Sequence, residues 1–162
     1  MNTSELSNTL TTLFTELVDG APQAGSYMLN RGDPGLLVSL DRLTSAAASA
    51  APPGEASIAA HVEHLRYGLS LMNRWAAGEE NPFADANWAA SWQRTTVSDA
   101  EWVQFRAGLR DEAHRWLEAI GTPREVNQVE LNGIVGSIAH LAYHVGAIRQ
   151  IDRTARGPAA ND

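Results

Sequence analysis

The stretch SIAHLAYHVGAIRQI, residues 137–151, places two histidines four positions apart in an otherwise apolar run. In an α-helix, positions four apart are separated by about 400° of rotation, so His140 and His144 lie roughly 40° apart on one face. Two neutral imidazoles arranged in this way can bind one metal ion. The pair therefore indicates part of a metal site, whose remaining ligands must come from another segment.

A third histidine, His64, can complete this site. It falls in the predicted helix 55–79 and lies with Gly68 and Trp75 on an apolar edge of that helix. Metal sites in helical bundles are built from side chains that project inward from facing helices. Three imidazoles bind zinc, nickel or iron(II) and leave at least one coordination position open, as metals that bind substrate require. His61, one turn earlier, is an alternative ligand or a donor that orients the site.

A purely structural role for these histidines is the competing interpretation. A chain of this length with five histidines produces some i, i+4 pair roughly one time in ten, so the pair alone is not specific. A histidine on an apolar edge is usually a hydrogen-bonded core residue. His114 is expected on a solvated face. Surface or capping roles suit the other polar side chains near the site, which are Glu63, Arg66, Tyr67 and Arg149.

The composition excludes several kinds of chemistry. The chain has no cysteine, which excludes disulfides, thiolate nucleophiles and sulfur-bound metals. All twelve basic residues are arginines, so Schiff-base and P-loop lysines are excluded as well. The net charge of −7, with the arginines scattered along the chain, argues against a nucleic-acid partner. Because we find neither a secretory signal pattern nor an apolar run long enough for a membrane span, we expect a cytoplasmic protein.

The elements that must position the histidines are helices. Apolar residues recur at helical spacing in four long segments, and Ser98 with Glu101 forms a capping box before the third of them. The four segments are 3–18, 55–79, 99–121 and about 130–153. The segment GSYMLNRGDPG, residues 25–35, is an irregular first connection. The pattern predicts an all-α four-helix bundle, with a single domain over residues 1–155 and a polar tail over 156–162.

Two segments resemble a known family. SIAAHVEHL is similar to the stretch that opens the second helix of the DinB-like superfamily, named for DNA-damage-inducible protein B, and HLAYHVGAIRQI resembles its C-terminal histidine signature. The resemblance implies a four-helix bundle, often dimeric, with a divalent metal held by His64, His140 and His144. It also covers Gly146, which we expect to allow close helix approach, and Arg149, to which it gives no role.

The resemblance implies two chemistries, because some relatives are thiol-dependent transferases or isomerases and others are described as metal-dependent hydrolases. The expected ion is Zn²⁺ or Ni²⁺, with Fe²⁺ as a further candidate. Since the chain has no cysteine, a thiol would come from a low-molecular-weight cosubstrate such as bacillithiol or mycothiol. The alternatives are a non-enzymatic metal-binding or stress-response bundle and a plain dimerisation module. We expect a small-molecule substrate, a homodimer, and neither a nucleic-acid nor a membrane partner.

Overall fold

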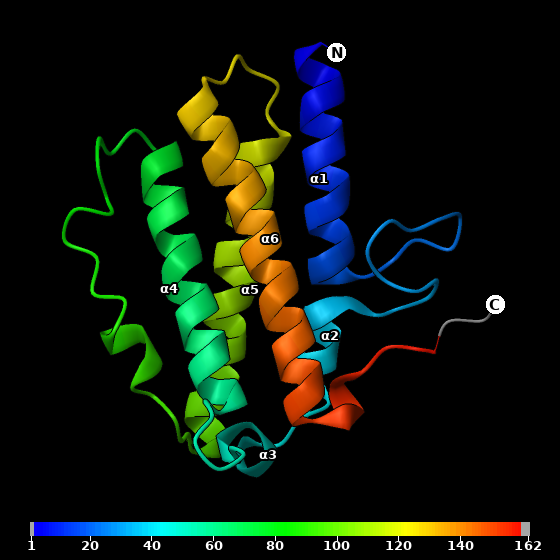
Figure 1. Ribbon diagram of the computed structural model, residues 1–162, viewed down its shortest axis with the longest axis vertical. Helices are drawn as coiled ribbons and strands as arrows, with labels where there is room; N and C mark the ends of the chain where they lie inside the picture. The colour runs from blue at the N-terminus through cyan, green and yellow to red at the C-terminus, as the bar shows by residue number, and fades with distance from the viewer. Residues whose placement is uncertain (1, 160–162) are drawn as a thin grey trace.

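The computed structural model describes residues 2–159 and confirms the all-α fold, with no strand in that range (Figure 1). The part of the chain that the structure describes has four long helices: α1 (Thr3–Asp19), α4 (Ile58–Ala76), α5 (Asp99–Gly121) and α6 (Gln128–Ile151). The short elements are α2 (Gly35–Asp41), α3 (Ser45–Ser49) and the 3-10 turns η1 (Ala90–Trp92) and η2 (Arg153–Ala155). The long helices lie side by side as a bundle, as the apolar spacing predicts.

Side-chain caps set the starts of the long helices. The predicted capping box of Ser98 and Glu101 is confirmed at α5. The cap of α4 is Ser57, whose hydroxyl accepts from the Ala60 N–H, so this helix begins three residues later than we predict. The cap of α1 is Asn2, whose side chain accepts from the backbone N–H of Glu5. A cap of this kind supplies a partner for an otherwise free N–H of the first turn.

The directions of the helices require a long return connection. In Figure 1, α4 and α5 both run upward, whereas α1 and α6 run downward. Because consecutive α4 and α5 are parallel, residues 77–98 must pass back along the whole length of α4. This segment contains η1, which packs against α4. The topology thereby lays a strip of irregular chain over the outer side of the α4–α6 pair.

The core is continuous through the bundle. Large apolar side chains from every long helix are almost fully inaccessible to solvent, and Trp116 donates from its indole Nε1 to Ser137 Oγ at 2.9 Å. The largest of these buried side chains include Phe14, Leu17, Ile58, Leu65, Leu109, Leu141 and Ile148. Apolar spacing alone would also place Val135 of α6 in the core, but this side chain is half exposed. The core holds α4 and α6 in fixed register, which any site shared between them requires.

The irregular first connection is held by two buried carboxylates. Glu16 accepts hydrogen bonds from the backbone N–H groups of residues 27–29, at distances between 2.6 and 3.1 Å. Asp33 forms a bidentate ion pair with Arg149 of α6, at 2.7 and 2.9 Å, and also accepts from the Gly35 N–H. Arg149, which the resemblance left without a role, therefore ties this connection to the last helix. A charged group is stable inside a protein when it is paired in this way.

The chain after α6 returns toward the same connection. Arg156 Nε donates to the Arg149 carbonyl at 2.9 Å, and Pro158 O accepts from the Asn30 side-chain amide at 2.8 Å. Residues 160–162 of the predicted tail lie outside the described residues. The domain boundary at residue 155 stays a prediction.

Helix α6 has the length and apolar composition that a membrane-spanning helix would have. The core helix of a soluble bundle has the same properties, and α6 packs against both α1 and α4. The absence of a membrane partner stays a prediction.

Candidate metal centre

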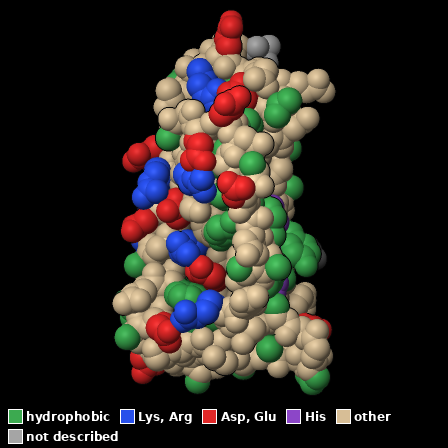
Figure 2. Space-filling view, turned by 90° about the vertical axis from the view of Figure 1, so that its left-hand side faces the viewer, with side chains coloured by type: hydrophobic (Ala, Val, Ile, Leu, Met, Phe, Trp, Pro, Cys, Tyr) green, Lys and Arg blue, Asp and Glu red, His purple; other side chains and the backbone are tan. Residues whose placement is uncertain are grey.

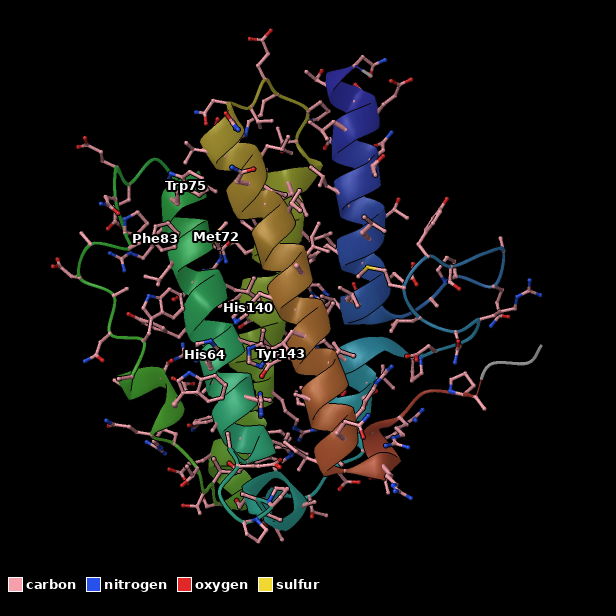
Figure 3. The ribbon with its side chains drawn as sticks, viewed as in Figure 1. His64, Met72, Trp75, Phe83, His140 and Tyr143 are labelled. Atoms are coloured by element: carbon pink, nitrogen blue, oxygen red, sulfur yellow. The ribbon has the colours of Figure 1, made fainter. Side chains whose placement is uncertain are left out.

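The three predicted ligands lie together between α4 and α6. One nitrogen from each of His64, His140 and His144 lies within 4.8 Å of the other two, and Figure 3 labels the first two of these residues. The side chains of His64 and His144 are buried, and His140 is partly exposed. The four-residue spacing predicted that His140 and His144 lie on one face of α6. The antiparallel packing of α4 against α6 then brings the imidazole of His64 beside them. The result is a buried three-histidine cluster that could bind a metal ion.

Hydrogen bonds fix which nitrogen of His64 faces the other two rings. Ser91 donates its hydroxyl proton to the Trp88 carbonyl at 2.7 Å, so its oxygen accepts from the Nδ1–H of His64 at 2.8 Å. A neutral imidazole that carries its proton on Nδ1 has a bare lone pair on Nε2. This Nε2 atom lies 3.2 Å from Nε2 of His140. The lone pair is therefore directed at the centre of the cluster.

His144 has a comparable partner in His61. Their Nδ1 atoms lie 2.7 Å apart, so one ring donates and the other accepts. With the proton on Nδ1 of His144, its Nε2 lone pair faces Nε2 of His140 at 2.9 Å. Of the two roles that the sequence left open for His61, this contact supports orientation of His144. Metal-binding histidines commonly use their second nitrogen in such a bond.

The geometry fits a small divalent cation. Zinc–nitrogen bonds of about 2.0–2.1 Å in a tetrahedral site separate two nitrogen ligands by roughly 3.3 Å. The Nε2–Nε2 distances of 2.9 and 3.2 Å are close to this separation. Nε2 of His140 faces Nε2 of both His64 and His144, and a single Nε2 proton on His140 cannot make a full hydrogen bond to both. The donor set therefore suits an ion better than a network of neutral hydrogen bonds.

Burial keeps these imidazoles neutral. Desolvation, with smaller contributions from neighbouring histidines, lowers the pKa of His144 to about 2 and that of His64 to about 4. Desolvation also lowers the pKa of His61 and of His140. Only the neutral imidazole offers a lone pair to a metal. Near neutral pH, the cluster is consequently in the form that binds cations.

The return connection covers the cluster with two indole rings that sequence reasoning did not place there. Trp92 stacks on His64 with ring centroids 4.2 Å apart, and Trp88 lies against the same imidazole at 5.6 Å. Among the tryptophans, helical spacing in the sequence placed only Trp75 on the histidine edge. The sequence holds no periodic signal for Trp88, Ser91 and Trp92, because they lie in irregular chain. Their position follows from the parallel direction of α4 and α5.

A cavity of about 350 Å³ opens beside the cluster along the seam between α4 and α6. His64 and His140 lie at one end of it, and Met72 and Phe83 line it further along (Figure 3). In Figure 2, histidine atoms are visible at the right-hand edge of the molecule, close to hydrophobic side chains. The first connection, residues 25–35, does not contribute to the lining of this cavity.

The other polar candidates are paired elsewhere. Glu63 and Arg66 form an ion pair with each other, at 2.6 and 2.8 Å. The Tyr67 hydroxyl accepts from the Asn87 N–H, and Arg149 is engaged by Asp33. His114 lies partly exposed at the surface, where its side chain is 44% accessible and contacts Asp19. None of these side chains lines the cavity.

The expectation for Gly146 is wrong. A Cβ atom placed on this residue would meet no heavy atom within 4 Å, so the glycine permits no close helix approach within the chain. Instead, α6 comes into close contact with α4 at Gly133, where an added Cβ would stand 2.7 Å from Trp75 Cζ3.

Comparisons with protein-family models, curated proteins and solved structures find no match to this chain. The geometry of the cluster therefore carries the functional argument.

Proposed function

We propose that the protein binds one divalent metal ion through the Nε2 atoms of His64, His140 and His144. The observation that carries this proposal is the convergence of three imidazole nitrogens with too few protons to satisfy one another. The orienting bonds of His64 to Ser91 and of His144 to His61 support it. Zinc or nickel suits a buried all-nitrogen donor set, and iron(II) is a third candidate.

The cavity beside the cluster favours an enzymatic role over a structural one. An ion held by three imidazoles with an open position activates a bound water or thiol, or polarises a carbonyl. In this chain, His64 and His140 border the cavity, so the open position would face it. Trp92 stacks on His64, and Trp88, which also lines the cavity, lies against the same imidazole. We propose either hydrolysis or transfer to a small-molecule thiol as the reaction class.

Membership of the DinB-like superfamily forms part of the same proposal. It is supported by the two sequence segments, the all-α bundle and the placement of the three signature histidines on two facing helices. A homodimer belongs to this proposal and can be tested by light scattering.

The alternative is a metal-binding bundle without catalysis, in which the ion ties α4 to α6. The two roles differ in solvent access to the ion. Exchangeable water at the metal, detected by magnetic relaxation of the nickel or cobalt form, supports the enzyme. A metal without such water, in protein that is inactive toward thiols, electrophiles and esters, supports the structural role.

Elemental analysis of protein prepared without a histidine tag tests metal binding directly. We expect about one equivalent of divalent metal per chain in the wild type and almost none in His144→Ala. His114→Ala is the matched control, because it removes a partly exposed histidine outside the cluster and should keep its metal. Equal metal contents in all three proteins would refute the proposal.

A further inference from the structure

The cavity between α4 and α6 has an unusual distribution of polarity. Among the described residues, His64 and His140 are its only ionisable lining side chains, and both lie at the same end (Figure 3). Apolar groups of Leu69, Met72 and Phe83 line the cavity further along. A ligand that fits this distribution carries one metal-binding group at the end of an uncharged apolar body.

The one hydroxyl in the lining is already occupied. Ser137 Oγ donates to the Ile134 carbonyl at 2.7 Å and accepts from the Trp116 indole at 2.9 Å. It therefore adds little polar recognition to the cavity. Away from the histidine end, a sugar or a charged cosubstrate would lose its hydration and find few new partners, which costs free energy.

Glycines on both helices leave room for such a ligand. A Cβ on Gly136 of α6 would meet no heavy atom within 4 Å, although this residue lines the cavity. On α4, a Cβ on Gly68 would reach ordinary contact distance from Trp88 and His140, at 3.6 and 3.9 Å. Gly136 is exposed as well as part of the lining, so the open space beside it lies at the mouth of the cavity, where an occupant would pass.

We propose that this cavity is a binding site for an aliphatic or aromatic molecule whose terminal donor group reaches the metal at the histidine end. The inference rests on the proposed metal function and specifies its substrate class. Burial of several methylene groups against the apolar walls would supply most of the affinity. Specificity would come from the length and width of the apolar body, because the walls carry no charge.

Two hydroxamates that differ only in their alkyl chain test this inference on the metal-loaded protein. Acetohydroxamate can bind the metal but is too short to occupy the apolar part of the cavity. Octanohydroxamate can bind the metal and also fill the apolar part. In the cobalt(II) form, whose visible spectrum reports ligation, we expect octanohydroxamate to bind roughly a hundredfold more tightly. We expect Gly136→Leu, which fills the open space, to reduce this preference to about threefold while acetohydroxamate binding is retained.

The matched control is Gly146→Leu. It introduces the same side chain on the same helix, where an added Cβ also meets nothing, but outside the cavity lining. It should keep the full preference for octanohydroxamate. Equal affinities of the wild type for the two hydroxamates would overturn the apolar site and leave the metal proposal intact. Failure of the wild type to bind cobalt would overturn both, so the two failures are distinguishable.

Discussion

Two buried polar regions of this bundle differ in how their polar atoms are satisfied. In the anchor formed by Glu16, Asp33 and Arg149, every carboxylate oxygen accepts from a backbone N–H or a guanidinium. In the histidine cluster, three Nε2 atoms face one another with no donor for at least one of them. A region whose polar atoms are all paired fits a structural role, whereas an incompletely paired one of this kind could bind an ion such as the proposed metal.

The largest expected effect concerns the anchor. Arg149→Ala leaves the buried Asp33 carboxylate without its cation, which should lower the free energy of unfolding by about 3 kcal/mol. Arg110→Ala, which breaks an exposed pair with Asp41, should cost less than about 1 kcal/mol. Urea titration of the metal-free proteins measures both values. If Arg149→Ala retains its metal content, the anchor and the cluster are independent; equal losses in the two variants would contradict the pairing argument.

Metal removal should have the next largest effect, and it should be confined to the cluster. At a free metal concentration about 100 times Kd, binding to the native state alone adds roughly 2.7 kcal/mol to the free energy of unfolding. Thermal melts with and without chelator should show this increment in the wild type and in Arg149→Ala. The increment should be absent in His144→Ala. An increment that persists in His144→Ala would place the metal elsewhere.

The fold was largely predictable from sequence, and the site only in part. Apolar spacing and the capping box at Ser98 predicted the long helices. The four-residue separation of His140 and His144 predicted that they share one helix face. Trp88 and Ser91 could not be predicted, since their position depends on the parallel direction of two helices and on no local pattern. The packing environment of Gly146 was mispredicted because sequence does not show which helix face is covered.

Acid should destabilise the cluster. The folded-state pKa of His64 is lowered to about 4 and that of His144 to about 2, whereas in the unfolded chain both lie near 6.5. Between those values the unfolded state binds more protons, so stability falls as pH decreases below about 6.5. Each such histidine contributes a slope of about 1.4 kcal/mol per pH unit.

Urea titrations of the metal-free protein between pH 7 and pH 5 measure this slope. Arg149→Ala should retain it, because the anchor contains no histidine, and His144→Ala should show a smaller one. A slope that is the same in all three proteins would assign the acid sensitivity to other groups.

The smallest expected effect separates the orienting residue from the ligands. His61→Leu removes the partner of His144 Nδ1 and should raise the Kd for zinc about tenfold, since loss of such a bond typically costs 10–100-fold in affinity. His61→Asn keeps a hydrogen-bonding atom near the position of Nδ1 and should recover most of that loss. Both variants should keep one metal equivalent at saturation, as an orienting role requires, and competition with a chromogenic chelator measures both quantities. If His61→Leu instead abolishes binding as His144→Ala does, His61 is itself a ligand and the cluster contains four imidazoles around the ion.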